Sequence, residues 1–260
     1  MSVTYSSYLK LDELLSLQKP LSDGPEHDET LFIVIHQVYE LWFKELIHEL
    51  DYLKVLLARG DAPRSLHTLK RVLTILKVAV HQIDVLETMT PLEFLSFRAR
   101  LESGSGFQSF QFREFEFLLG AKEPRALDRY EPGSEPRRRL EKRLAESTVW
   151  DAFVHYLAKA GHPVPKSALE RDVRLGAAPN PELQPVLISI YRSDPAASTL
   201  CERFVDLDEG VQEWRYRHVK MVERTIGTKA GTGGSAGAQY LKTTLDRPVF
   251  PDLWQIRAYL

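Results

Sequence analysis

The sequence contains one cysteine, Cys201, in 260 residues. A single thiol can form neither an internal disulfide framework nor a multi-cysteine metal or iron-sulfur site, and it is typical of a reducing compartment. No Cys-x-x-Cys-His motif occurs, which excludes covalently attached c-type haem. The composition therefore excludes disulfide scaffolds and cysteine-ligated clusters.

Long apolar runs and a strong net charge are also absent. No run approaches the ~20 residues that span a bilayer, and the opening MSVTYSSYLKLDELL lacks the organisation of a signal peptide. The formal net charge of -2 gives no footprint for nucleic acid. A basic cluster at 137–143 alternates with acids, which predicts a solvated helix face. We therefore expect a cytoplasmic protein with neither a nucleic-acid nor a membrane partner.

What the chain has is helical periodicity and ample apolar material, at 43% hydrophobic residues. We predict one all-α domain over residues 1–260, a helical bundle in which short turns separate the helices. Asp28 is the expected N-cap of the first long helix, and Thr90-Pro91-Leu92-Glu93 is a capping-box start signal. The phenylalanine-rich stretch 107–119 also alternates like a strand, but its helical neighbours favour a helix. The expected helices are 29–57, 66–86, one from Thr90, 107–119, 138–145, 149–160, 183–192 and 199–227.

Two segments stand apart from this bundle. Residues 1–25 read as a terminal arm whose Tyr5, Tyr8 and Leu9 need a docking place on the body or on a neighbouring subunit. Residues 121–180 are more polar and rich in proline, and we expect them to form a peripheral helical excursion of the same domain.

The stretch 214–237, WRYRHVKMVERTIGTKAGTGGSAG, combines an inward histidine with a glycine-rich loop. On a helix, His218 shares the apolar face of Trp214, Met221, Val222 and Thr225, whereas the charged residues 215, 217, 220, 223 and 224 decorate the rest. A lone histidine on such a face is usually a satisfied core residue, and glycine runs are usually connectors. The loop lacks a P-loop ending and follows a helix, so phosphate binding is not indicated.

Two more side chains are candidates for a site. His36 shares the inward stripe of Phe32 and has Glu40 one turn later, so it is either a core histidine bonded to Glu40 or a ligand-facing group. Arg98 lies one turn from Phe94 beside an apolar face. It either snorkels to solvent or clamps a carboxylate in a partly dry pocket.

Six segments, in the family's order, closely resemble tryptophan 2,3-dioxygenases: YSSYLKLDELLSLQKPLS, HDETLFIVIHQVYELWFKELIHELD, LETMTPLEFLSFRARL, SGFQSFQFRE, WRYRHVKMVERTIG and GTGGSAG. The resemblance spans nearly the whole chain and is weakest in the middle excursion. It implies an all-helical, b-type haem enzyme, typically a homotetramer. Such an enzyme inserts both atoms of O2 across the indole C2–C3 bond of L-tryptophan to give N-formylkynurenine, which opens tryptophan catabolism.

The same resemblance implies roles for individual residues. His218 matches the proximal ligand of haem iron, His36 the distal histidine that hydrogen-bonds the indole N–H, and Arg98 the carboxylate clamp. Whether His36 orients the ring or takes its proton stays open. Further matches are Phe32 as an indole wall, Thr232 at the amino-acid end, Ser105 and Gly106 over the distal haem face, and Tyr5, Tyr8 and Leu9 entering a neighbouring subunit's site. Arg113, in SFQFRE, is a further candidate to pair with a haem propionate, on its charge and location rather than on a family match.

The chain departs from the family pattern at two positions. Phe94 stands where some relatives have tyrosine, so a hydroxyl contact to the substrate carboxylate is missing, and Ala236 replaces a serine in the glycine-rich loop. Two other functions compete with the dioxygenase. One is a monooxygenase acting on a substituted tryptophan, and the other is a non-catalytic haem or O2 sensor, which has no need for a carboxylate clamp.

Overall fold

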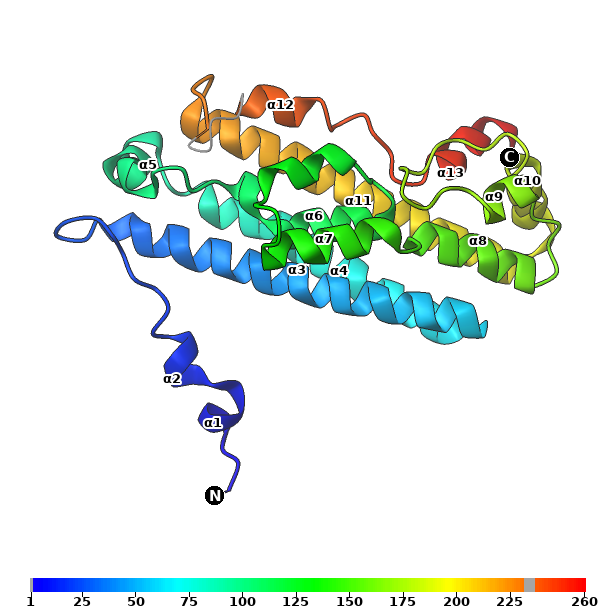
Figure 1. Ribbon diagram of the computed structural model, residues 1–260, viewed down its shortest axis with the longest axis horizontal. Helices are drawn as coiled ribbons and strands as arrows, with labels where there is room; N and C mark the ends of the chain where they lie inside the picture. Colours follow the sequence, from blue (N-terminus) through cyan, green and yellow to red (C-terminus); the bar gives the residue numbers. More distant parts are fainter. Residues whose placement is uncertain (1, 232–236) are drawn as a thin grey trace.

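The computed structural model describes residues 2–231 and 237–260, and every regular element in these ranges is helical. Three long helices run side by side along the molecule (Figure 1): α3 (His27–Arg59), α4 (Ala62–Leu86) and α11 (Pro195–Ile226). The central one of the three is α4, which packs against both α3 and α11. The predicted all-α domain is confirmed.

Shorter helices cover the flanks and one end of this layer. Helices α6 and α8 pack on α3, while α10 and α13 pack near the start of α11. The remaining elements are α1 (Tyr5–Leu9), α2 (Leu11–Leu14), α5 (Pro91–Arg98), η1 (Ala99–Leu101), η2 (Gly106–Gln108), α6 (Phe110–Leu119), η3 (Pro124–Arg129), α7 (Glu135–Ala145), α8 (Val149–Lys159), α9 (Lys166–Leu169), α10 (Gln184–Ser193), α12 (Ala238–Lys242), α13 (Pro251–Gln255) and η4 (Ile256–Tyr259).

The core follows the apolar stripes of the long helices. On α3, Leu46, Leu50 and Leu53 recur at three- and four-residue steps and are completely buried. Each such side chain contributes about 1.5–3 kcal/mol by leaving water. Among the described residues, no helix combines the length and the apolar composition needed to cross a membrane.

The start of α3 differs from the prediction. Its N-cap is Glu26 rather than Asp28, and no side chain caps it. The reason is the buried carboxylate of Glu29, which accepts hydrogen bonds from the backbone N–H groups of Leu21 (2.7 Å) and Ser22 (3.0 Å). These bonds fold the preceding turn back onto the helix, so that Asp28 lies within its first turn.

Two predicted starts are confirmed. Thr90 and Glu93 form a reciprocal capping box at α5, in which the Glu93 carboxylate accepts from the Thr90 N–H at 2.6 Å. The phenylalanine-rich stretch is helical, with the 3₁₀ turn η2 ahead of α6. This places the aromatic rings of α6 toward α3 and α11.

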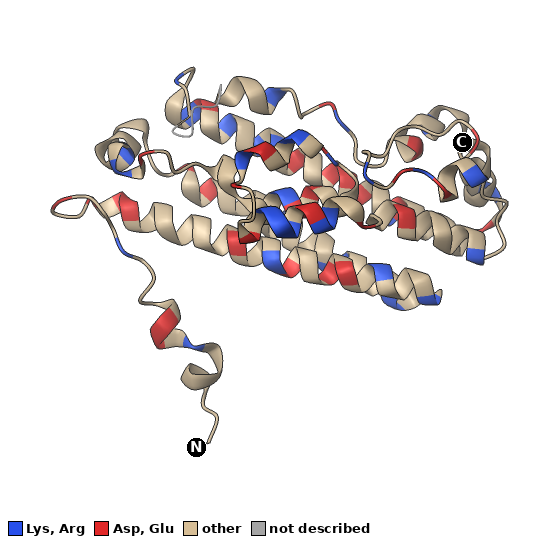
Figure 2. Ribbon diagram, viewed as in Figure 1, with Lys and Arg blue, Asp and Glu red and all other residues tan. Residues whose placement is uncertain are grey.

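The basic cluster of α7 is not the purely solvated face that was expected. The side chain of Arg143 is 12% exposed and forms bidentate bonds to Asp51 of α3 (2.7 and 2.9 Å), and a further bond to Glu114 of α6 (2.9 Å). Arg139 also pairs with Glu114. Figure 2 shows the basic segments of α7 interleaved with acidic ones. The alternation of charges therefore marks a face that joins three helices through ion pairs.

The two predicted satellites differ in how they meet the body. The arm, with α1 and α2, projects away from the bundle (Figure 1). Within 121–180, by contrast, α8 packs on α3 and buries Trp150 and Phe153 in the main core. That excursion thus contributes to the interior, mainly through α8.

Candidate active site

A cavity of about 650 Å³ lies between α3, α5, α6 and α11. Ligand pockets typically enclose ~300–1,000 Å³. These four helices supply much of its aromatic wall, including Phe32, Phe43, Phe94, Phe112 and Trp214. A wall of this kind accepts flat apolar groups, and the few polar side chains within it determine how a ligand is oriented.

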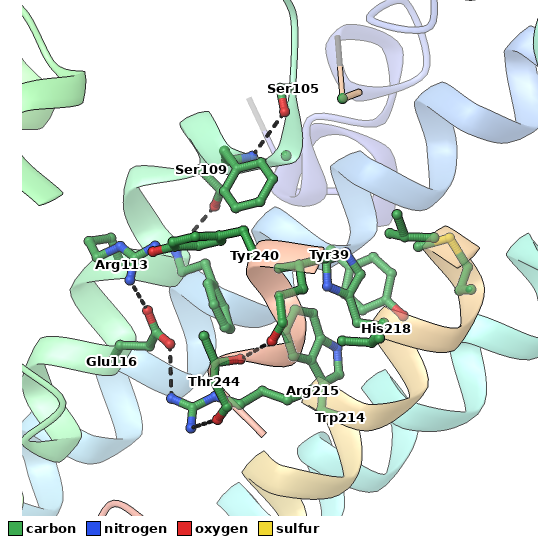
Figure 3. Close-up of a pocket in the computed structure, with 18 of the residues that line it drawn as sticks. Tyr39, Ser105, Ser109, Arg113, Glu116, Trp214, Arg215, His218, Tyr240 and Thr244 are labelled. Atoms are coloured by element: carbon green, nitrogen blue, oxygen red, sulfur yellow. Dashed lines mark hydrogen bonds and ion pairs between the residues drawn. The ribbon is translucent and has the colours of Figure 1, made fainter. Parts of the chain in front are cut away.

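His218 presents a neutral imidazole to this cavity from α11, as the helical periodicity predicted (Figure 3). Trp214, one turn earlier, stacks on its ring with the centroids 4.9 Å apart. Burial, and secondarily the nearby His36, lowers the pKa of His218 to about 4. Neither ring nitrogen bonds to a described residue. The side chain is thus deprotonated at neutral pH and has a nitrogen lone pair available for a ligand.

His36 faces the same cavity from α3, and its tautomer follows from one hydrogen bond. Its Nδ1 lies 2.7 Å from the carbonyl oxygen of Phe32. Because a carbonyl can only accept, Nδ1 carries the proton and Nε2 is left as an acceptor. The alternative of a core histidine bonded to Glu40 is wrong, because no hydrogen bond joins these two side chains, and the Glu40 carboxylate accepts from Gln111 at 2.8 Å. Burial lowers the pKa of His36, which keeps the ring neutral.

Arg98 closes the cavity at the end of α5. Its Nη2 donates to the carbonyl of Ala230 at 2.7 Å, just before the glycine-rich segment. Its Nε is buried and has no partner among the described residues. Unpaired buried donors are rare because they have lost water without gaining an acceptor. The guanidinium therefore keeps donors available for an anionic group inside the cavity, as a clamp requires.

The other predicted pocket residues of this part of the chain also line the cavity. Ser105 caps η2 by accepting from the Phe107 N–H at 3.4 Å, and Gly106 follows it. Arg113 reaches the wall from α6 and forms an ion pair with Glu116. Phe32 and Phe94 lie side by side with ring centroids 5.8 Å apart. Residues from 32 to 113 in sequence thus meet around one space.

Two predicted groups are not placed there. Tyr5 and Tyr8 are each 76% exposed and Leu9 is 41% exposed, and none of the three lines the cavity of its own chain. Thr232 and Ala236 lie outside the described residues.

Sequence reasoning missed an aromatic group at the cavity wall. Phe107 and Tyr240 meet edge to face at 5.4 Å, and the Arg129 guanidinium lies 5.5 Å and 5.4 Å from the two ring centroids. Arg129 also donates to the Tyr240 hydroxyl at 3.2 Å. Tyr240 lies more than a hundred positions along the chain from both Phe107 and Arg129. The only local signal was the position of Tyr240 just after the glycine-rich loop.

Arg215 was predicted on the solvated side of α11, and this is wrong. It is 6% exposed and pairs with Glu116 at 3.0 Å. The helical pattern counted a charge as a surface residue, whereas a carboxylate from α6 lies in the interior to receive it. Arg215 and Glu116 thereby both form part of the cavity wall.

The depressed pKa of His218 predicts how acid affects the ligand-free protein. The unfolded chain binds a proton near pH 6.5, whereas the folded chain does so only near pH 4. The free energy of unfolding should therefore fall as the pH drops from 6.5 to 4, by up to about 3 kcal/mol. Urea titrations between pH 6.5 and 4 should show a smaller fall in the free energy of unfolding for His218→Leu than for the parent protein. The control His81→Leu, which changes an exposed histidine, should fall as steeply as the parent. Equal slopes in all three proteins would contradict the prediction.

Comparison with known proteins identifies the family. The model of the tryptophan 2,3-dioxygenase family matches residues 1–131 and 180–260. The chain is 59% identical to a tryptophan 2,3-dioxygenase of Herpetosiphon aurantiacus, covering 100% of this chain and 99% of that protein. It is 58% identical to one of Anaeromyxobacter sp. (100% and 97% covered) and 45% identical to one of Caulobacter vibrioides (99% and 98% covered). The chain therefore belongs to the tryptophan 2,3-dioxygenase family.

Proposed function

We propose that this enzyme cleaves the indole C2–C3 bond of L-tryptophan with O2, using b-type haem, and yields N-formylkynurenine. One observation carries the proposal: a neutral imidazole, His218, shares a largely aromatic cavity with an acceptor histidine, His36, and an arginine with free donors, Arg98. Family membership supports the same reaction. A sensor would need no carboxylate clamp.

The residues of the cavity fit haem. Proteins hold haem iron through a side chain such as histidine, and the polarity of the surrounding pocket decides how the group treats O2. His218 would hold the iron, because it is neutral and its ring nitrogens have no partner among the described residues. Arg113 would pair with a propionate, and Ser105 and Gly106 would form part of the pocket wall around the group. The bound group supplies O2 binding and oxidative chemistry, while the protein excludes water and fixes the substrate.

The remaining side chains account for tryptophan. Arg98 would hold the carboxylate through its unpaired donors, and the neighbouring Phe94 of α5 adds no hydroxyl to this hold. Phe32 would form the indole wall. His36, with Nε2 as acceptor, would receive the indole N–H, which orients the ring and offers a lone pair for its proton. Thr232, outside the described residues, would close on the amino-acid end.

The test is isotopic. Ferrous, haem-loaded protein is given L-tryptophan under ¹⁸O2, and the product is weighed by mass spectrometry. We expect two labelled atoms in a ring-opened product. A single labelled atom would establish a monooxygenase instead, and absence of turnover with haem and O2 bound would overturn the proposed substrate.

We also propose that the enzyme assembles from copies of itself, as a homotetramer, and that the arm completes a neighbour's site. The support is the exposure of an apolar arm. Tyr5, Tyr8 and Leu9 lie on α1, which has no buried residue, and the arm projects from the body (Figure 1). Apolar side chains so exposed are typical of surfaces that become covered on association.

Deleting residues 1–10 should lower turnover at least ~10-fold, because the neighbouring site loses part of its wall. Complementation provides the sharper measurement. Truncated subunits with an intact pocket, mixed with full-length Arg98→Ala subunits that have an intact arm, should recover activity. As a control, Tyr259→Ala changes an exposed tyrosine near the C-terminus and should leave turnover unchanged. A truncated protein with full activity on its own would reject a role for the arm.

A further inference from the structure

Three charged side chains form a buried cluster in one wall of the cavity. Glu116 of α6 pairs through Oε1 with Arg215 of α11 at 3.0 Å and through Oε2 with Arg113 of its own helix (Figure 3). The side chains of Glu116 and Arg215 are each 7% exposed, and that of Arg113 is 13% exposed. Two guanidinium groups on one carboxylate leave a net charge of +1 where water screens little.

Arg215 ties the cluster to a third part of the chain. Its Nη1 donates to the carbonyls of Thr244 (3.3 Å) and Arg247 (3.1 Å), beyond α12. Gln212, one turn earlier on α11, also donates to the Arg247 carbonyl, at 2.6 Å. Arg215 stands three residues before His218, so these bonds act on the turn of α11 that leads directly to the imidazole.

A gain in folding stability does not explain why such a cluster is buried. Burying ions loses hydration, and replacing a buried ion pair by apolar side chains is often neutral or stabilising. All three residues line the cavity, and the pair reaches from α6 to the helix of His218. An electrostatic effect on the group that His218 binds would account both for the burial of these charges and for their position in the cavity wall.

We propose that Glu116, through Arg215, is a positioning residue for the proximal histidine, and that its charge sets the balance between ferric and ferrous haem. The inference rests on the proposed haem function. Arg215 holds the rotation of α11 about its axis and hence the direction in which His218 points. The carboxylate offsets one of two positive charges near the iron, and so keeps the ferric form accessible.

The chain contains a matched control on the same helix. Glu114, two residues before Glu116, is also buried, with a side chain 4% exposed, and it also pairs with two arginines, Arg139 and Arg143. It does not line the cavity. Glu114 and Glu116 thus share residue type, helix, burial and pairing, and they differ in whether they face the site.

The experiment measures the ferrous-to-ferric ratio of haem-loaded protein at a fixed applied potential, with redox mediators. Glu116→Gln keeps the shape but removes a negative charge, which favours the less positive ferrous iron, and we expect the ratio to rise about tenfold. Arg215→Gln removes a positive charge and should lower the ratio by a similar factor. Glu114→Gln should stay within about twofold of the parent, since its charge lies outside the cavity wall.

The sign reversal separates this proposal from a purely structural role. A loosened site would move both cavity variants in the same direction, and that result would overturn the proposal, as would equal shifts in Glu116→Gln and Glu114→Gln. If circular dichroism shows that one cavity variant does not fold, the other variant still tests the proposal. The sign and size of its change in the ferrous-to-ferric ratio are then compared with those of Glu114→Gln. Haem loading and ¹⁸O2 turnover of the parent protein are measured first. Their absence would reject the proposed function, whereas their presence with unshifted variants would reject only this inference.

Discussion

His218→Ala should purify with little or no haem and should lose turnover by far more than ~100-fold. Even partners that only orient a metal ligand cost 10- to 100-fold when removed, and His218 is proposed as the ligand itself. It is the imidazole that Trp214 stacks against on α11, and its low pKa keeps it deprotonated under assay conditions. The Soret absorbance per protein and the rate of N-formylkynurenine formation measure the two effects.

Two further measurements separate loss of the ligand from loss of the fold. His81 is exposed on α4, and His81→Ala should keep both haem and activity. Free imidazole should diffuse into the space left in His218→Ala and restore part of the haem binding, because the rest of the pocket is unchanged. A variant with normal haem content and full activity would overturn the assignment.

Much of the fold was predictable because apolar periodicity reports which helix face meets the core. The face that carries Trp214, His218 and Met221 was read directly, since each lies three or four residues from the next. Capping chemistry at Thr90 is equally local. The start of α3 was misplaced because the deciding contact, Glu29 with the turn at Leu21, runs backwards from the helix and has no periodic signature.

The polar part of the site was less accessible to such reasoning. Arg215 pairs with Glu116, ninety-nine positions earlier, and nothing near either residue indicates that the other is buried beside it. Spacing left open a bond from His36 to Glu40, whereas Nδ1 of the ring bonds to the carbonyl of Phe32. Long-range ion pairs and bonds to backbone carbonyls depend on how the helices are placed in space. The residue types and their spacing along a single helix do not encode that placement.

We expect the donors of Arg98 to determine how tightly tryptophan binds. One Nη is committed to the Ala230 carbonyl, and Nε remains unpaired in the described part of the structure. A carboxylate that meets this fork gains charge-assisted bonds to a partly dehydrated cation. Since Phe94 contributes no hydroxyl, no neighbouring side chain on α5 substitutes for the lost bonds. The guanidinium should therefore supply most of the recognition of the amino-acid end.

Arg98→Ala should lower kcat/KM for L-tryptophan by roughly 30-fold to several thousand-fold, which corresponds to the ~2–5 kcal/mol lost when one member of a buried charge pair is truncated. Arg98→Lys should recover only part of this, because an ammonium keeps the charge but not the planar fork. Steady-state kinetics with haem-saturated protein gives both values.

The ligand itself provides the decisive control for Arg98. Tryptamine retains the indole and the amine but lacks the carboxylate, so its dissociation constant should hardly differ between the parent and Arg98→Ala. If both ligands weaken equally, Arg98 shapes the pocket rather than clamping an anion. Arg100→Ala removes an arginine two residues further on, which pairs with Asp23 and does not line the cavity, and it should leave both affinities unchanged. A loss that requires both the carboxylate and the guanidinium can come only from their direct contact, which makes the pair of ligands more informative than either variant alone.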